Sequence, residues 1–122
     1  MRAKRKHHEL RAWQSAMSLV KDIYRITALF PKEEMYALTS QMRRAAVSIP
    51  SNIAEGAARG TDKEFAHFLH VARGSLSELE TQLIIAHELA YVEELLDIEQ
   101  QVEQIFILIG GLIKSIKGRT TA

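Results

Sequence analysis

The chain has 122 residues, a length that supports one domain built around a single hydrophobic core. With 47% hydrophobic and 25% charged residues, its composition is that of a globular protein and excludes the disordered and collagen-like classes. The chain has no cysteine, which excludes a disulfide framework, a thiolate metal site and a cysteine nucleophile.

The amino end is basic but does not read as an export signal. Polar sequence from Glu9 onward follows the basic residues, where a signal peptide would have an apolar stretch. No apolar run approaches the roughly 20 residues that span a bilayer, so we expect no contact with a membrane. We therefore predict a cytoplasmic protein, with residues 1–8 as a flexible basic arm and residues 118–122 as a C-terminal tail.

The net charge is only +1, yet the charges are unevenly distributed. Residues 1–73 hold 13 Lys or Arg against 7 Asp or Glu, whereas residues 74–113 hold 8 acidic residues and no Lys or Arg. Two arrangements fit this pattern. The molecule has a basic and an acidic pole, or neighbouring helices pair these charges and cancel them.

The first half of the chain predicts two helices, over residues 9–29 and 39–58. In the first, apolar residues recur every three or four positions. Pro31 ends this helix, because the residue before a proline is pushed out of the α region. Pro50 lies inside the second helix, where it removes a backbone donor and predicts a kink. The apolar stripe expected on the first helix is Leu10, Trp13, Met17, Val20, Tyr24 and Thr27.

The second half predicts helices over residues 62–90 and 93–117. Thr61 and Glu64 have the spacing of a capping box at the start of the third helix. Spacings of three and four then continue from Phe65 to Ala90, a heptad pattern typical of bundled helices. Short connections favour antiparallel neighbours. The predicted fold is an all-α, up-down-up-down antiparallel four-helix bundle over residues 9–117.

The segment from Ile105 to Ile113 has no polar side chain on any face. A helix that is apolar all round needs cover all round, and four helices from one chain would cover only about half of it. We therefore predict a homo-oligomer. The residues expected to pack against another copy are Phe106, Ile107, Leu108, Gly110 and Gly111.

A polar stripe follows one face of the second predicted helix. Serine and asparagine are unusual in an exposed helix interior, because their side chains compete for backbone hydrogen bonds. Two interpretations stay open: a partly buried polar network, within or between protomers, or a solvated face. The stripe consists of Gln41, Arg44, Ser48, Asn52 and Glu55, followed by Arg59.

No set of residues completes a catalytic, metal or cofactor site in the sequence. Glu64 and His67 match the Glu-x-x-His unit of di-iron bundles, but neither His70 nor His87 has a glutamate three residues before it. No nucleophile elbow and no phosphate-binding glycine loop is present. We therefore expect a protein that is not an enzyme and that has no metal or cofactor.

The strongest functional signal is positive charge. In an up-and-down bundle, the start of the first helix, the second connection and the end of the fourth helix lie at the same end, which predicts a basic pole. Such a surface binds phosphate backbones through counterion release, whereas ordinary solubility charge is the alternative reading. The candidate residues are Arg5, Lys6, Arg11, Arg59, Lys63, Lys114, Lys117 and Arg119.

Several motifs together resemble the four-helix-bundle family known as 23S ribosomal RNA intervening-sequence proteins. The most specific is the stretch from Leu38 to Gly56, which contains the letters SNIAEG. The chain differs from the family pattern at Ala37, at Gly110-Gly111 and in the basic arm. The other residues that carry the resemblance are Trp13, Gln14, Ala16, Ile23, Tyr24, Phe30, Pro31, Glu34, Tyr36, Phe65, Phe68, Leu69, Gly74, Ser75, Glu78, Leu79, Glu80, Gln82, Leu83 and Tyr91.

The resemblance implies similarity to bacterial proteins encoded within inserts of ribosomal RNA genes, although many other members stand alone with no assigned role. It implies no catalytic residues. Related accessory proteins of diversity-generating retroelements form pentamers that bind nucleic acid and a reverse transcriptase, so the resemblance favours a homopentamer with such partners. Our first hypothesis is an accessory protein that binds RNA, or else DNA, through its basic surface. The second is a structural or protein-interaction scaffold that uses the polar stripe as its interface.

Overall fold

The structure is a computed structural model that describes residues 3–121. Four helices account for most of it, with two short 3-10 helices, η1 (Lys6–Glu9) and η2 (Lys32–Glu34), before α1 and α2. No strand occurs in this range, so the prediction of an all-α protein with four helices is confirmed. The helices are α1 (Arg11–Thr27), α2 (Leu38–Ala58), α3 (Asp62–Glu88) and α4 (Leu96–Thr121).

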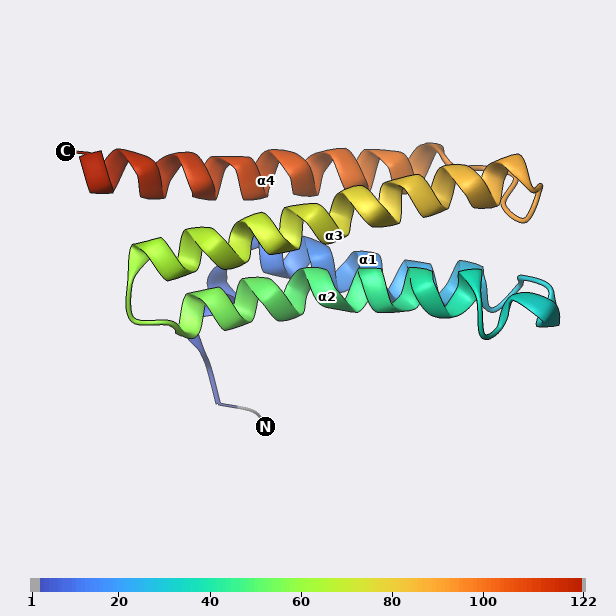
Figure 1. The fold of residues 1–122 in the computed structure, drawn as a ribbon, viewed down its shortest axis with the longest axis horizontal. Helices are drawn as coiled ribbons and strands as arrows, with labels where there is room; N and C mark the ends of the chain where they lie inside the picture. The colour runs from blue at the N-terminus through green and yellow to red at the C-terminus, as the bar shows by residue number, and fades with distance from the viewer. Residues whose placement is uncertain (1–2, 122) are drawn as a thin grey trace.

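The four helices lie side by side along the length of the molecule (Figure 1). Contacts join α1 with α2, α2 with α3, α3 with α4, and α4 with α1, so the helices enclose one core. In Figure 1, η1, the α2–α3 connection and the end of α4 all lie toward the same end. None of the helices in the described range is long and apolar enough to span a membrane.

The two chain ends are more regular than the sequence predicted. The expected flexible arm includes η1, in which the rings of His7 and His8 lie 5.1 and 5.0 Å from that of Trp13. The amide of Gln14 also donates to the backbone carbonyl of His8 (2.7 Å), which ties η1 to α1. At the other end α4 continues to Thr121, so the predicted tail is helical up to that residue. Met1, Arg2 and Ala122 lie outside the described residues.

The buried face of α1 differs from the predicted stripe. Met17 and Tyr24 of that stripe are exposed, and Trp13 and Val20 are only half-buried. The core instead takes a face rotated around the helix, which includes the buried alanines Ala12 and Ala16. The larger side chains then lie at its margin as apolar surface. The buried residues of α1 are Ala12, Ala16, Leu19, Ile23 and Thr27.

The seams of α3 and α4 follow their predicted spacing. Leu76, Leu79 and Leu83 of α3 are buried, as are Val102, Ile105 and Ile109 of α4. However, α3 ends at Glu88 and α4 begins at Leu96. The connection is therefore longer than the predicted turn. Its Val92 and Leu95 are buried, so the loop itself closes that part of the core.

The two ends of α3 are closed by different capping motifs. At the start, the Thr61 hydroxyl oxygen accepts from the Glu64 backbone N–H (3.1 Å), which confirms the predicted cap. At the end, the backbone N–H of Tyr91 donates to the carbonyl of Ala86 (2.9 Å), a Schellman closure. Ala90 occupies the position that such closures usually give to glycine, with φ 63°.

Gly56 allows α2 and α3 to approach closely. A Cβ atom at this position would lie 2.8 Å from the Cβ of Phe68 and 3.0 Å from a ring carbon of Phe65. Neither distance fits a side chain without movement of α3. Gly74 lies in the interior of α3 and has no atom within 4 Å of the corresponding position.

We predict that Gly56→Ala lowers the free energy of unfolding by about 1–3 kcal/mol, because the added methyl overpacks the α2–α3 contact. Gly74→Ala is the matched control. It should raise stability by up to about 1 kcal/mol, because alanine has the higher helix propensity and the site is open. Urea unfolding followed by circular dichroism measures both. A Gly56→Ala variant as stable as the control would contradict the close contact.

We predict that Ala90→Gly raises the free energy of unfolding by about 1 kcal/mol, because a left-handed backbone is strained for alanine and relaxed for glycine. The control is Ala28→Gly, which also follows a helix but has φ −62° and should gain nothing. Thermal unfolding compares the two variants. A lower melting temperature for Ala90→Gly would be inconsistent with this closure.

Candidate nucleic-acid interface

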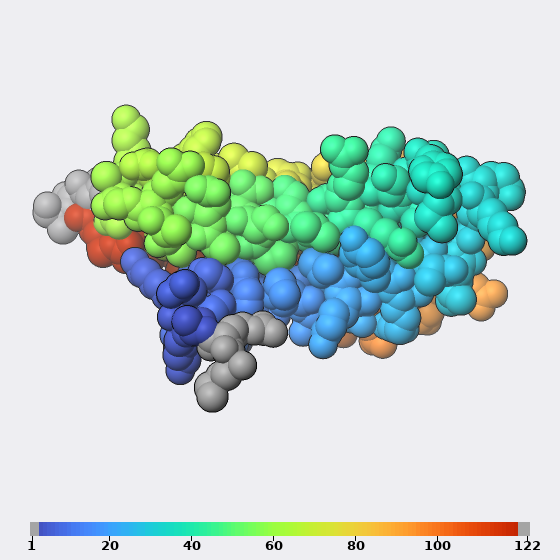
Figure 2. Space-filling model, turned by 90° about the horizontal axis from the view of Figure 1, so that it is seen from below, coloured from blue at the N-terminus to red at the C-terminus, as the bar shows by residue number. Residues whose placement is uncertain are grey.

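Basic residues from four separate segments meet at one end of the bundle, here called the basic end. They come from η1 and the residues beside it, the start of α1, the α2–α3 connection and the end of α4. Figure 2 shows the N-terminal residues, the end of α2 and the red end of α4 close together on this face. The basic end consists of Lys4, Arg5, Lys6, Arg11, Arg59, Lys63, Lys114, Lys117 and Arg119.

Two of the predicted phosphate-binding residues are held in ion pairs. Arg59 lies 3.0 Å from the Glu55 carboxylate and 3.6 Å from that of Glu64. Arg119 bonds Asp62 at 3.2 Å, and this hydrogen bond lowers the pKa of Asp62. The Arg119–Asp62 pair joins the end of α4 to the start of α3, and the Arg59–Glu64 pair joins the end of α2 to the start of α3. They also make both arginines less available to a ligand.

Lys4 pairs with Glu9 (2.9 Å), whereas four other cations at this end are more accessible. Lys6, Arg11, Lys63 and Lys114 are exposed. Over residues 3–121, none of these four forms an ion pair with a carboxylate. Because exposed, unpaired cations retain their full attraction for anions, they are the stronger phosphate-binding candidates of the predicted set.

Two histidines are sensitive to the positive charge at this end. Partial burial lowers the pKa of His70, and the charges of Arg73 and Lys117 lower it further. The pKa of His7 is also lowered, by partial burial and by the neighbouring His8 and Arg5. Desolvation is the larger cause of both shifts, and the neighbouring positive charges add to it in the same direction because they disfavour the protonated ring.

The acidic half of the sequence does not cancel these charges. Within the part of the chain that the structure describes, no carboxylate between Gly74 and Ile113 forms an ion pair. These carboxylates are carried by α3 from its middle onward, by the α3–α4 connection and by α4. The sequence allowed either two oppositely charged poles or pairing of the charges between neighbouring helices. The structure fits the first arrangement better than the second.

The predicted polar stripe of α2 is partly used in packing against α3. The Ser48 and Ser75 hydroxyls lie 2.8 Å apart, and the Asn52 amide donates to the Ser48 hydroxyl (2.9 Å) and carbonyl (2.8 Å). This half-buried network lies within the protomer. Gln41, Arg44 and Glu55 are exposed, so the two ends of the stripe are solvated.

The apolar segment of α4 is covered more completely than the sequence predicted. Phe106 and Leu108 are half-buried against the core, and Ile107 is the side chain that stays open, with 59% of its surface exposed. Gly110 and Gly111 have no atom from another element within 4 Å of a Cβ position. Gly110 is half-buried and Gly111 is exposed, so the glycine pair and Ile107 form an apolar strip on this face of α4.

A groove between α1 and α2 was not anticipated from the sequence. It has a volume of about 310 Å³, and three of its lining residues belong to the stripe that was predicted to lie in the core. The shifted face of α1 is the reason for this error. The lining residues are Trp13, Met17, Val20, Val47, Pro50, Ser51 and Ala54.

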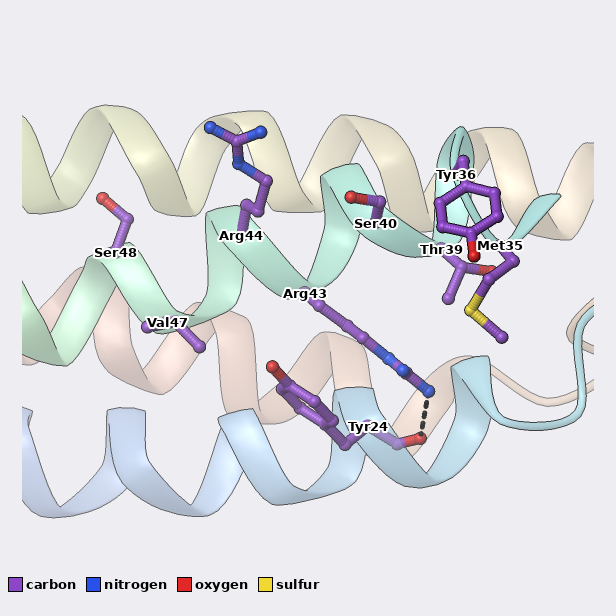
Figure 3. A pocket seen from close by; sticks show the side chains of 9 residues that line it. All are labelled: Tyr24, Met35, Tyr36, Thr39, Ser40, Arg43, Arg44, Val47 and Ser48. Carbon is purple, nitrogen blue, oxygen red and sulfur yellow. Dashed lines mark hydrogen bonds between the residues drawn. The ribbon is translucent and has the colours of Figure 1, made fainter.

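A second hollow lies nearer the start of α2 (Figure 3). It encloses about 550 Å³ and is lined by two tyrosines and two arginines, together with Met35, Thr39, Ser40, Val47 and Ser48. Arg43 reaches from α2 to α1, where it donates to the Thr27 hydroxyl (2.9 Å) and lies over the Tyr24 ring, 4.6 Å from its centroid. Tyr36 and Arg44 complete the lining.

The structure brings together no group of side chains suited to a metal ion. Among the described residues, no three His, Asp or Glu side chains are placed to hold one. The ring of His67 lies edge-on to that of Phe68, with centroids 5.1 Å apart, and Glu64 is occupied by Thr61 and Arg59. The Glu-x-x-His spacing therefore serves helix capping and packing in this chain.

The match to a family model decides the family. Residues 8–111 match the family described as 23S rRNA-intervening sequence protein. The chain belongs to the 23S rRNA-intervening sequence protein family. A search of curated proteins gives no match.

The motifs that carry the family resemblance have structural roles in this chain. Ser48, Asn52 and Gly56 of the SNIAEG region form the α2–α3 contact. At the opposite end, the Tyr91 hydroxyl donates to the Glu34 carboxylate (2.9 Å), which raises the pKa of Tyr91. The most specific family residues therefore hold helices and loops together and leave the basic surface to other positions.

We predict that His70 titrates below the ordinary histidine value of about 6.5, and that Lys117→Gln moves its pKa upward. The reason is that removing a neighbouring positive charge makes protonation easier. An NMR pH titration of the histidine ring signals measures this shift. Lys21→Gln, a charge removed from the middle of α1, should leave the pKa of His70 unchanged. An equal shift in both variants would contradict a local basic surface.

Proposed function

We propose that this 23S rRNA-intervening sequence protein is a non-enzymatic accessory protein that binds nucleic acid, with RNA favoured, through its basic end. The observation that carries the proposal is the convergence of exposed cations from four segments, described above. Binding would depend on the phosphate backbone and would not read sequence. The family description, which refers to ribosomal RNA, favours RNA over DNA.

The proposal includes self-association. The strip of Ile107, Gly110 and Gly111 is apolar and exposes the Ile107 side chain, and the Trp13–Val47 groove is an apolar hollow. These two surfaces lie on different parts of the protomer, so a contact between them would be head-to-tail, the kind of contact that generates a ring when the rotation between copies closes. A pentamer, which the family resemblance favours, would place five basic ends around one axis and so raise the affinity for a polyanion.

We expect the affinity for single-stranded RNA to fall steeply with salt. The double variant Lys63→Gln/Lys114→Gln should weaken binding and reduce the slope of log K against log salt by about one for each lysine. Fluorescence anisotropy with a labelled oligonucleotide, measured between 50 and 300 mM salt, gives both quantities. Lys21→Gln is the charge-matched control. If Lys21→Gln weakens RNA binding as much as the single variant Lys63→Gln does, RNA is not bound preferentially at the basic end.

We expect light scattering to give a mass well above that of one chain. Ile107→Glu should lower this mass, because a carboxylate cannot be buried without a partner. Thr81→Glu adds the same charge to an exposed position on α3 and should not lower it. A monomeric mass for the unmodified protein at all concentrations would refute self-association.

A scaffold for another protein, such as a reverse transcriptase, is the second candidate. The exposed Gln41 and Arg44 at the start of the polar stripe, beside an exposed Met35, are the observations that favour it. Under this reading RNA shows no saturable binding, and a partner protein co-purifies with the chain. The salt titration distinguishes the two functions.

A further inference from the structure

Tyr36 is an aromatic residue that the fold leaves almost fully in solvent. Its side chain is 96% exposed, more than any other large hydrophobic residue in the described range. Burial of a tyrosine ring is normally favourable, so a ring held in water on the surface of a bundle is available to a ligand. It lies between η2 and α2, away from the basic end.

The loop that carries Tyr36 is anchored on both sides. Glu34, two residues earlier, accepts hydrogen bonds from the Tyr91 hydroxyl (2.9 Å) and from the backbone N–H of Leu38 (3.3 Å). Phe30 is buried, and its ring centroid lies 5.3 Å from that of Tyr91. Because these contacts fix the loop from the α3–α4 connection, less conformational entropy is lost when a ligand packs on the Tyr36 ring.

Tyr36 lines two hollows of about 550 Å³ each. Arg44, Ser40 and Ser48 also line both of them, so the same surface offers an aromatic ring, a cation and hydroxyl groups. The first hollow, drawn in Figure 3, has no acidic residue in its lining, and the second has Glu78.

Arg43 and Arg44 have different roles at this place. Arg43 is held by Thr27 and by the backbone carbonyl of Tyr24 (3.4 Å), the contact dashed in Figure 3. In the same view Arg44 points away from α1. Arg44 is exposed and forms no ion pair with a described carboxylate, so its guanidinium is available to a phosphate.

We propose that Tyr36 and Arg44 form a stacking site for an unpaired nucleobase and its phosphate within single-stranded RNA. An exposed ring accepts any base on its face, and a neighbouring arginine neutralises the backbone. Arg44 and Arg59 are 15 residues apart on or next to α2, which corresponds to about 22 Å of helix. A strand held at the basic end can therefore extend along α2 to this site. The inference rests on the proposed RNA-binding function.

The test compares labelled single-stranded and duplex RNA of equal length with the full chain and its variants. Tyr36→Ala should weaken single-strand binding about tenfold and leave duplex binding unchanged, because bases in a duplex are already stacked. Tyr36→Phe should keep the affinity, since the ring is retained. Arg44→Gln should weaken binding of the single strand and reduce its salt slope by about one.

The controls separate this site from the proposed function. Leu29→Ala removes another side chain, 82% exposed, from the connection between α1 and η2 and should leave single-strand binding unchanged. Salt-dependent RNA binding that is equal in Tyr36→Ala and in the unmodified chain would overturn the stacking site and leave the proposed function standing. Absence of RNA binding by the unmodified chain would overturn both.

Two further outcomes would reassign the surface. If adenosine monophosphate binds as tightly as single-stranded RNA, the surface is a site for a free nucleotide, and the assignment to single-stranded RNA is overturned. If Tyr36→Ala lowers the mass measured by light scattering but leaves the RNA affinity unchanged, another copy of the chain docks on this loop, and the stacking site is overturned.

Discussion

The contact between α2 and α3 at Gly56 determines how the rest of the bundle is placed. Phe65 and Phe68 lie directly against this glycine, and the Ser48–Ser75 hydrogen bond joins the same two helices two turns away. These contacts fix the end of α2 beside the start of α3. They thereby fix the connection that carries Lys63 and the Asp62 carboxylate, to which Arg119 fastens α4. The close packing of two helices is therefore what assembles the basic end.

The charge distribution follows from this arrangement more than from the net charge. A chain with a net charge of +1 can still present a strongly basic surface when its cations are gathered at one end and its carboxylates are carried elsewhere. Ion pairs at the basic end then determine which of its cations are available to a ligand. Arg59 and Arg119 serve mainly as structural ties, whereas Lys6, Arg11, Lys63 and Lys114 stay available to an anion. The function proposed for this family member rests on that division.

Much of the fold could be predicted from the sequence because helical spacing and capping signals are local. The four helices, the Thr61 cap and the seams of α3 and α4 belong to this group. The buried face of α1 could not be predicted, since two alanines competed with larger residues and only the packing of neighbouring helices decides between them. The hollow beside Trp13 could not be predicted for the same reason, because it depends on which face of α1 is buried. The hollow beside Tyr36 depends on a loop that is held by Tyr91, a residue far away in the sequence. No pattern within one segment contains this information.

The central claim is that nucleic acid is bound at the basic end, and lysine footprinting tests it most directly. The chain has lysines at the basic end, such as Lys6, Lys63 and Lys114, and a reference at Lys21 in the middle of α1. The rate at which each lysine is acetylated is measured by mass spectrometry with and without saturating RNA. A lower rate in the presence of RNA shows that RNA protects that lysine. The account predicts strong protection of the three basic-end lysines and an unchanged rate at Lys21. Uniform protection of all four lysines, or protection of Lys21 alone, would contradict it.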